Sequence, residues 1–475
     1  MLDTGIRQLR MARSLIWGRP ISADNVRRLV GDALRTLEEF GAPGDDVQLL
    51  LDGPYADPEL RRSFQTRALR RTAVRAASLS PFYRELFARA DVAPDRLTLE
   101  DLPKVPLTRK QDLLDRAEDF VADGSRPYLS TRTTGTTGRP AEIWLSRKEI
   151  ELWPAMAALS GLLRGEIGPA DFMQINISSR ATAAVQQNVT VCGLVGARCI
   201  VLGLVPPEES LDGLCSGGDA APTLLSTYPS YLAELVRAAR QRGLGAGAFR
   251  LRRIDCGGEL LSASLAAAAA ETFGAAVNDT FAMTEVLPVS GRTCAEEHLH
   301  HDLNMGLIEI VDPDTGQPAG PGEIGTVVVT PYYPFRECMP VLRYDTRDLV
   351  QRLPDEALHC DLAGTPGTSR ILGKADQLLR SEGRPVTPRD LVEIYEALPS
   401  QPWPARFTAH EHDGRIRLSV ARSGLGDLTP DALAERFDAA GIAVTVQLAD
   451  DDALGRRLRP ARADLLETTF ASEER

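Results

Sequence analysis

The sequence predicts an α/β protein with a large N-terminal domain of mostly parallel sheets and a small C-terminal α/β domain. Three observations support this: a helical opening segment, a central region where short apolar runs alternate with helical stretches, and a C-terminal segment with its own hairpin signal. Such alternation is typical of βα units around a parallel sheet. A chain of 475 residues is long enough to form more than one hydrophobic core.

The opening segment, residues 1–125, is predicted to be helical. Apolar residues recur at helical spacing from Val26 to Phe40, and Ser22 precedes them as a candidate N-cap. From about Tyr128 the pattern changes to short apolar runs. We expect strands at Cys199–Leu202, Leu224–Thr227, Arg253–Cys256, Ala276–Phe281, Leu307–Asp312 and Gly325–Thr330, and a helix at Ser264–Phe273.

The domain boundary is predicted near Gly373–Asp376, which gives a large domain over residues 1–373 and a small, mobile one over 374–475. In the small domain, Asp413-Gly414 is a strong turn signal between two predicted strands. The elements expected there are a helix at Thr387–Ala397, strands at Arg406–His412 and Arg415–Ala421, a helix at Pro430–Ala440 and a strand at Val444–Leu448.

Charge and composition exclude several classes of protein. The formal net charge of −12 argues against non-specific nucleic-acid binding, which needs a basic surface. No apolar run approaches the roughly 20 residues of a membrane span, and Met1–Pro20 does not have the pattern of a signal peptide. The seven cysteines are scattered without a CxxC pair, which fits a reducing compartment. We therefore expect a cytoplasmic protein without nucleic-acid or membrane partners; a homodimer remains open.

The sharpest motif is a run of threonines and glycines that ends in a cation. Its residues are Thr133, Thr134, Gly135, Thr136, Thr137, Gly138, Arg139 and Pro140. Glycines allow the backbone to approach an anion, and successive N–H groups can cradle phosphate oxygens. The run lacks the GxxxxGK[ST] spacing of a Walker A loop. By itself it fits a polar turn as well as a phosphate site.

Further motifs follow in a recognisable order. They are Gly257-Gly258-Glu259, Phe281-Ala282-Met283-Thr284-Glu285, Arg343-Tyr344-Asp345-Thr346-Arg347-Asp348 and Gly373-Lys374-Ala375-Asp376. With the stretch from Leu79 to Asp112, they make the chain resemble the adenylate-forming enzymes, in particular the phenylacetate–CoA ligase branch. The resemblance covers roughly residues 60–400.

The resemblance implies roles for these motifs. The threonine–glycine run would hold the ATP phosphates, with Arg139 and Thr284 catalytic beside Glu285, the implied Mg²⁺ ligand. The segments Gly257-Gly258-Glu259 and Phe281-Ala282 would line the adenine, and Lys374, at the hinge to the small domain, would be a further nucleotide-binding residue. Asp348 would hold the ribose. The alternative for Asp348 is a surface ion pair with Arg343 or Arg347.

The sequence departs from the family pattern at three places. Arg139 ends the phosphate loop where lysine is usual, which keeps the charge but replaces a point charge with a planar fork. Phe281-Ala282 replaces the common Tyr-Gly. No lysine follows Lys374, although the family usually carries one near the C-terminus that bridges carboxylate and phosphate. The tail offers instead Arg456, Arg457, Arg459 and Arg462, which fit a solvated face equally well.

Cysteine and histidine residues raise the question of zinc. Some relatives in this branch have a structural zinc site in this region, and the corresponding candidates are Cys294, His300, Cys338 and Cys360. Three cysteines and one histidine are an acceptable tetrahedral set for Zn²⁺. The alternative is that these are ordinary free cysteines, which are often buried.

The leading functional prediction is an enzyme that uses ATP and Mg²⁺ to convert a carboxylic acid into an acyl-adenylate, and then transfers the acyl group to CoA. The segment from Gln174 to Gln187, where the acyl pocket would begin, is polar, which favours a hydroxylated or amino-substituted aromatic acid. Transfer to an amine or hydroxyl acceptor, or diazotase-type chemistry in secondary metabolism, stays open. The missing lysine also leaves open a catalytically impaired nucleotide-binding homologue.

Overall fold

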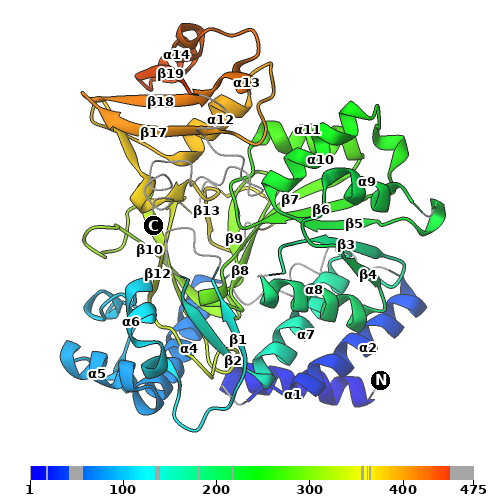
Figure 1. Cartoon of the computed structure of the whole chain (residues 1–475). Coiled ribbons are helices and arrows are strands. Elements are labelled where there is room, and N and C mark those ends of the chain that lie inside the picture. The colour runs from blue at the N-terminus through cyan, green and yellow to red at the C-terminus, as the bar shows by residue number, and fades with distance from the viewer. Residues whose placement is uncertain are drawn as a thin grey trace. The chain divides into compact units, whose positions relative to one another are not determined.

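The computed structural model describes residues 2–17, 20–41, 57–133, 140–179, 181–216, 218–354, 358–360, 362 and 365–449 (Figure 1). The chain divides into two compact units. The first unit comprises Met1–Gly203, Thr280–Thr346 and Gln351–Arg370, and the second comprises Leu204–Asp279, Arg347–Val350 and Ile371–Arg475. Among the described residues, no helix combines the length and apolarity needed to cross a membrane.

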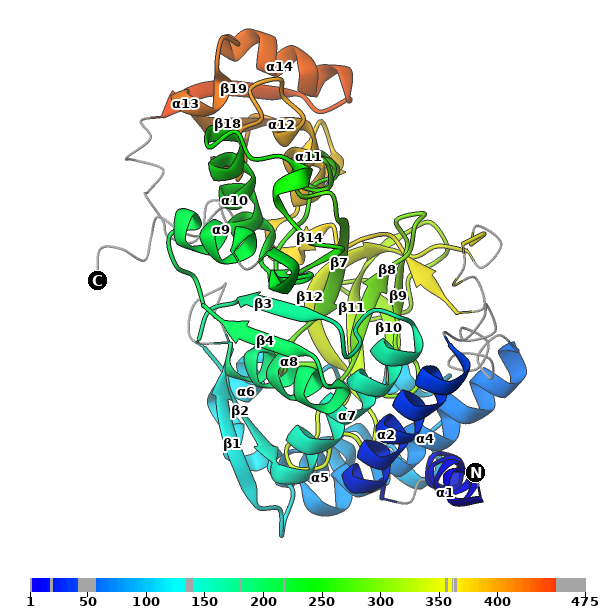
Figure 2. The ribbon, with the colours of Figure 1, turned by 90° about the vertical axis from the view of Figure 1, so that its right-hand side faces the viewer.

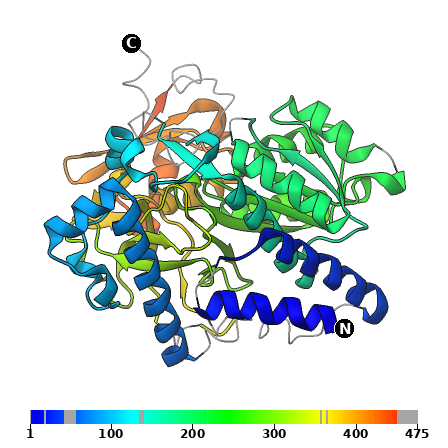
Figure 3. The ribbon, with the colours of Figure 1, turned by 90° about the horizontal axis from the view of Figure 1, so that it is seen from below.

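The opening segment of the first unit is helical, as predicted. Its helices are α1 (Leu2–Trp17), α2 (Ala23–Phe40), α4 (Pro58–Leu79), α5 (Pro81–Ala90) and α6 (Lys110–Phe120), with 3₁₀ turns η1 (Pro94–Arg96) and η2 (Leu102–Lys104). The predicted cap is confirmed, because the Ser22 hydroxyl accepts a hydrogen bond from the Asn25 amide at 3.3 Å. The dark-blue helices α1 and α2 lie together (Figure 3) and are joined by Arg7, whose guanidinium binds the buried Asp32 carboxylate at 2.6 and 2.7 Å.

The remainder of the first unit is built from hairpins and one βαβ motif. The elements are β1 (Pro127–Arg132), β2 (Glu142–Ser146), α7 (Arg147–Leu163), β3 (Phe172–Asn176), α8 (Thr182–Val195) and β4 (Arg198–Val201), followed by η5 (Thr284–Val286), β8 (Ser290–Thr293), β9 (Leu299–His301), β10 (Gly306–Val311), β11 (Ile324–Pro331) and β13 (Gly367–Thr368). Strands β3 and β4 are parallel, whereas β8 pairs antiparallel with both β9 and the end of β7 (Ala276–Ala282).

The second unit contains two hydrophobic cores. The first core surrounds α9 (Pro207–Cys215), η3 (Gly218–Ala220), β5 (Leu224–Thr227), α10 (Pro229–Gln241), η4 (Ala246–Ala248), β6 (Arg253–Gly257) and α11 (Ala263–Phe273). The second core surrounds β15 (Leu379–Ser381), β16 (Arg384–Val386), α12 (Pro388–Glu396), β17 (Phe407–His412), β18 (Arg415–Ala421), α13 (Arg422–Leu425), α14 (Pro430–Ala439) and β19 (Val444–Ala449). Two short pieces, β14 (Gly373–Lys374) and η7 (Ala375–Gln377), precede the second core, and β14 pairs with the end of β12 (Tyr344–Gln351).

The predicted helices and strands are confirmed to within two residues at their ends. The hairpin signal is confirmed by its backbone: Asp413 and Gly414 have φ of 50° and 74°, the left-handed values that a tight two-residue turn requires. Helix α14 lies against β19, which runs parallel to β18 (Figure 2). Along the chain, the residues of the second core begin shortly after the predicted domain boundary near residues 373–376. The boundary itself stays a prediction.

A buried carboxylate connects the two cores of the second unit. Glu396, at the end of α12, accepts hydrogen bonds from the Ser262 hydroxyl at 2.5 Å and the Ala405 amide at 2.8 Å. Burial raises the pKa of Glu396 to about 7; Ser262, the Ala405 amide and Arg389 oppose the shift, and Glu393 adds to it. The folded protein therefore binds a proton here at pH values where the unfolded chain has lost it.

We expect this carboxyl to make stability fall as the pH rises. Because its folded pKa lies above its unfolded value, its contribution is complete below pH about 4.5 and is lost as the pH passes through about 7, a change of about 3 kcal/mol. Urea unfolding between pH 4.5 and 8 should show this loss in the wild type and not in Glu396→Gln. Identical pH profiles for the two proteins would contradict it.

Candidate active site and metal centre

The predicted phosphate loop connects the two strands of the β1–β2 hairpin. Thr133 is buried, and its amide donates to the Ala141 carbonyl at 3.0 Å while its hydroxyl accepts from the Ala141 amide at 3.0 Å. The base of the loop is thus a closed pair of hydrogen bonds. Thr134, Gly135, Thr136, Thr137, Gly138 and Arg139 lie outside the described residues, so their roles stay predictions.

Glu285 lies in the short turn η5, directly after β7, and is only 5% exposed. The carbonyl of Leu287, two residues later, accepts a hydrogen bond from Nη1 of Arg336 at 3.3 Å. Arg336 is itself buried, and its Nε donates to the Met339 carbonyl at 2.7 Å. Arg336 therefore anchors the end of the turn that carries Glu285. Nothing in the sequence motifs had indicated this arginine.

The charge of Arg336 is buried and has a carboxylate near it. Burial lowers the pKa of Arg336, while Glu149 and, to a smaller extent, Glu285 oppose this shift. Oε1 of Glu149 is 4.0 Å from Nε of Arg336. The same carboxylate accepts from the amides of Glu337 at 2.7 Å, Cys338 at 3.2 Å and Ser146 at 2.5 Å. Glu149 is thus both a helix capping residue and the counter-ion of Arg336.

In the second unit, two predicted nucleotide-site residues meet across a pair of strands. Asp348 on β12 is in register with Lys374 on β14, and Nζ of Lys374 is 2.9 Å from Oδ1 of Asp348. One alternative partner is ruled out by the structure, because Arg343 binds Glu309 at 2.9 Å and donates to the Leu102 carbonyl at 2.6 Å. Asp348 therefore pairs with Lys374, which is itself a residue of the predicted nucleotide site.

The predicted adenine segment begins at Gly257, the last residue of β6. Gly258 has a left-handed φ of 81°, and a Cβ there would lie 3.6 Å from the ring of Tyr228. Glu259 accepts a hydrogen bond from the Ser230 amide at 3.1 Å. The ring of Tyr228 thus lies beside the predicted adenine segment, and the sequence motifs had not indicated it.

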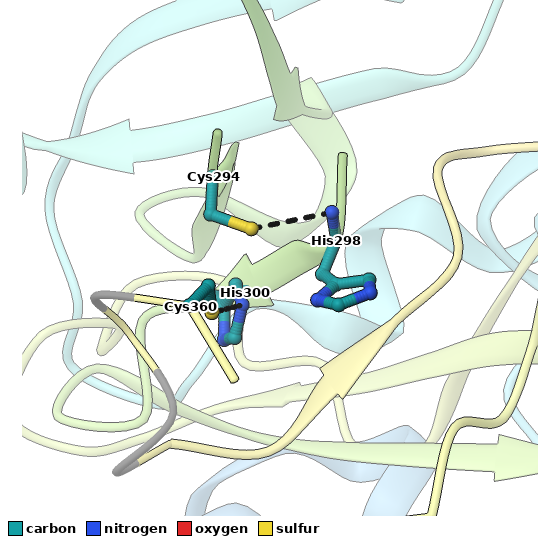
Figure 4. Close-up of side chains that lie close together, drawn as sticks. All are labelled: Cys294, His298, His300 and Cys360. Atoms are coloured by element: carbon teal, nitrogen blue, oxygen red, sulfur yellow. Dashed lines mark hydrogen bonds between the residues drawn. The ribbon is translucent and has the colours of Figure 1, made fainter. Parts of the chain in front are cut away.

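A cluster of four potential metal ligands lies beside the β8–β9 hairpin (Figure 4). The ligand atoms of Cys294, His298, His300 and Cys360 all lie within 4.8 Å of one another. Nε2 of His300 is 3.3 Å from Sγ of Cys360, and the His298 amide is 3.3 Å from Sγ of Cys294. Two thiols and two imidazoles at such separations match the donor set of a tetrahedral Zn²⁺ site.

The structure corrects one member of the predicted ligand set. Cys338 is fully buried elsewhere in the first unit, where its carbonyl accepts from the Ala122 amide at 2.8 Å and its amide donates to Glu149. His298 takes its place in the cluster. The signal for His298 was present in the sequence: His298 comes directly before the strand that carries His300, and residues two apart along extended backbone point to the same face.

Comparison with known proteins agrees with this fold. The family model described as "AMP-binding enzyme" matches residues 70–336, more than half of the chain. The chain belongs to the AMP-binding enzyme family, whose members are adenylate-forming enzymes. Within it, the chain falls in the phenylacetate–CoA ligase-like branch, as the order of its motifs had indicated.

Two relatives support this placement, and one solved structure shows the fold. The phenylacetate-coenzyme A ligase of Thermus thermophilus is 28% identical over 351 residues, covering 72% of this chain and 76% of the relative. That of Escherichia coli K12 is 29% identical, covering 70% and 75%. The solved structure of a 2-hydroxyisobutyryl-CoA ligase in the postadenylation state, with 2-HIB-AMP, has a TM-score of 0.73 at 20% identity, covers 86% of this chain and 89% of that one, and shows the fold.

The buried pair of Glu149 and Arg336 gives a stability prediction. Glu149→Ala should lower the free energy of unfolding by about 3–5 kcal/mol, because it leaves a buried guanidinium without its counter-ion. The matched control is Glu151→Ala on the same helix, which breaks a more exposed pair with Arg147 at 2.9 Å and should cost at most about 1 kcal/mol. Urea unfolding measures both, and equal effects would contradict the assignment.

Proposed function

We propose that this enzyme activates a carboxylic acid with ATP and transfers the acyl group to coenzyme A. The observation that carries the proposal is the buried Glu285 in the turn after β7, inside the segment that matches the AMP-binding family. The phenylacetate-coenzyme A ligases that this chain resembles add support for the acid and the acceptor.

Each residue of the proposed site has a physical task. Attack of the acid's carboxylate on the α-phosphate concentrates negative charge on phosphate oxygens, so the site must position and neutralise it. The loop from Thr133 to Arg139 would cradle the phosphates with N–H groups and one cation. Asp348 would accept hydrogen bonds from the ribose hydroxyls, and Lys374, 2.9 Å from Asp348, would hold that carboxylate in place.

Magnesium fits the donor chemistry of this site. Mg²⁺ prefers carboxylate and phosphate oxygens, and Glu285 offers a carboxylate inside the protein. When bound, the ion would neutralise charge on the phosphates of ATP. Thr284, beside Glu285, would add a hydroxyl donor to the same phosphates.

The proposed acid is a substituted aromatic acid. Support comes from the start of the predicted acyl pocket on β3, where Gln174 and Asn176 are fully buried. Nε2 of Gln174 donates to Oδ1 of Asn176 at 2.9 Å, and Nδ2 of Asn176 donates to the Gly203 carbonyl at 2.8 Å. A strand with buried amide side chains favours an acid that carries a hydroxyl or amino group over a purely apolar one.

The lack of a lysine after Lys374 supports a second candidate function. No lysine follows Lys374 in the sequence, so the family's C-terminal bridge between carboxylate and phosphate would have to come from another cation. An altered acceptor, such as an amine or hydroxyl, or diazotase-type chemistry would accommodate this change. Mass spectrometry of the products formed with and without CoA distinguishes these reactions from thioester formation.

The decisive test is ATP–pyrophosphate exchange across a panel of aromatic acids. We expect exchange in the wild type and a loss of about 10²–10³-fold in Glu285→Gln, the cost of removing one charge-stabilising group. Glu296→Gln changes an exposed glutamate of the same region and should leave exchange intact. Near-normal exchange in Glu285→Gln, with the protein folded, would remove Glu285 from the site.

We also propose that the cluster of Cys294, His298, His300 and Cys360 holds a structural Zn²⁺. The ion would join the turn between β8 and β9 to the segment around Cys360, which is distant in sequence. A closed set of four protein ligands is typical of structural zinc rather than catalytic zinc.

Metal analysis of protein purified without chelators should find about one zinc per chain. His298→Ala should lower the zinc content strongly, because it removes one of four ligands, whereas Cys338→Ser should leave it unchanged. The reverse result, with zinc lost in Cys338→Ser and retained in His298→Ala, would restore the ligand set expected from the sequence.

A further inference from the structure

A row of three residues crosses the end of β7 and the β8–β9 hairpin. Phe281 is in register with Gly291, and Gly291 is in register with His301. Because the middle residue has no side chain, the two rings meet above it, with centroids 5.4 Å apart and planes at 88°. A Cβ on Gly291 would lie 3.1 Å from Nδ1 of His301 and 2.9 Å from the Leu299 side chain. The glycine is what allows this arrangement.

His301 differs from its neighbour His300 in its partners. His300, on the opposite face of β9, has Nδ1 3.1 Å from the Thr365 hydroxyl and Nε2 3.3 Å from the Cys360 thiol. His301 is 7% exposed, and within the described part of the chain neither of its ring nitrogens has a hydrogen-bond partner. Buried polar atoms in proteins are nearly always paired, so an imidazole with two unpaired nitrogens requires an explanation.

The position of the ring gives that explanation. His301 touches Phe281, which comes three residues before Thr284 and four before Glu285 in the motif of the proposed active site. A phenyl ring can pack flat against a planar ligand, and that of Phe281 is 8% exposed. The neutral imidazole beside it offers one donor and one acceptor. Together they complement an aromatic ring that carries a group able both to donate and to accept.

We propose that His301 is a specificity-determining residue, which hydrogen-bonds the polar group of a planar ligand bound against Phe281. This inference rests on the proposed function. Two ligands of the reaction carry the required chemistry: an aromatic acid with a hydroxyl or amino substituent, and the amino-bearing edge of adenine in ATP. A ligand without the group leaves the imidazole unpaired, and sites of this kind reject such analogues strongly.

The experiment has two arms, one for each candidate ligand: the aromatic acid and the adenine of ATP. In the acid arm, kcat/KM for pyrophosphate exchange is measured with hydroxy- and amino-substituted aromatic acids and with their unsubstituted parents. In the nucleotide arm, calorimetry measures the binding of ATP and of purine riboside triphosphate, which lacks the amino group. The variants are His301→Leu, His301→Gln, which keeps a donor and an acceptor, and the control His412→Leu, whose histidine is 49% exposed on the β17–β18 hairpin.

We expect the wild type to prefer the polar ligand at least tenfold in one arm. His301→Leu should abolish that preference while binding the ligand without the group as well as the wild type does. His301→Gln should restore part of the preference, and His412→Leu should leave it intact. The arm that responds identifies the ligand.

Three results would overturn the proposal. The wild type could show no preference in either arm, or its preference could persist in both His301→Leu and His301→Gln. The third result is that His301→Leu lowers kcat/KM or affinity equally for the polar ligand and for its counterpart without the polar group. Failure of the proposed function looks different. In that case the wild type would show no exchange with any acid, while a preference for ATP that depends on His301 would still be measurable by calorimetry.

Discussion

The buried guanidinium of Arg336 is the interaction on which the arrangement around Glu285 depends. A charge without solvent must be paired and hydrogen-bonded, or it costs several kcal/mol. Arg336 meets this requirement in part. Its Nε lies 4.0 Å from Glu149 at the start of α7, and it donates to the Leu287 carbonyl after the Glu285 turn and to the Met339 carbonyl of its own loop, whereas its Nη2 has no hydrogen-bond partner among the described residues. These segments are distant in sequence, so one side chain fixes the geometry of the turn that carries the proposed metal ligand.

The two faces of the β8–β9 hairpin carry different groups of side chains. Successive residues of a strand point to opposite faces, so His300 and His301 serve different surroundings although they are neighbours in sequence. One face carries the four-residue cluster of thiols and imidazoles, and the other carries the contact between His301 and Phe281. The cluster and the contact of His301 with Phe281, a residue of the proposed active-site motif, therefore share strand β9.

The second unit uses the same physical strategy with different residues. Asp348 on β12 and Lys374 on the two-residue strand β14 form an ion pair, which lies close to the point where the second hydrophobic core begins. Farther along, α12 is tied to the segment before and at the start of α11 by Arg389 and Glu393. Nη1 of Arg389 donates to the Leu261 carbonyl at 3.0 Å, and the Ala263 amide donates to Glu393 at 2.9 Å. Charged side chains here bind backbone groups of the neighbouring core, which is a directional form of attachment.

The sequence by itself determined the local features of this protein. Helices and strands were predictable because periodicity, caps and turn residues act over a few positions, as Ser22 and the Asp413-Gly414 turn illustrate. The order of the motifs also indicated the family. The tertiary structure alone decided that Cys360 lies beside His298 and His300 while Cys338 is buried elsewhere in the first unit, and that His301 faces Phe281. Those outcomes depend on strand register and on contacts between segments far apart in sequence, which spacing along the chain does not encode.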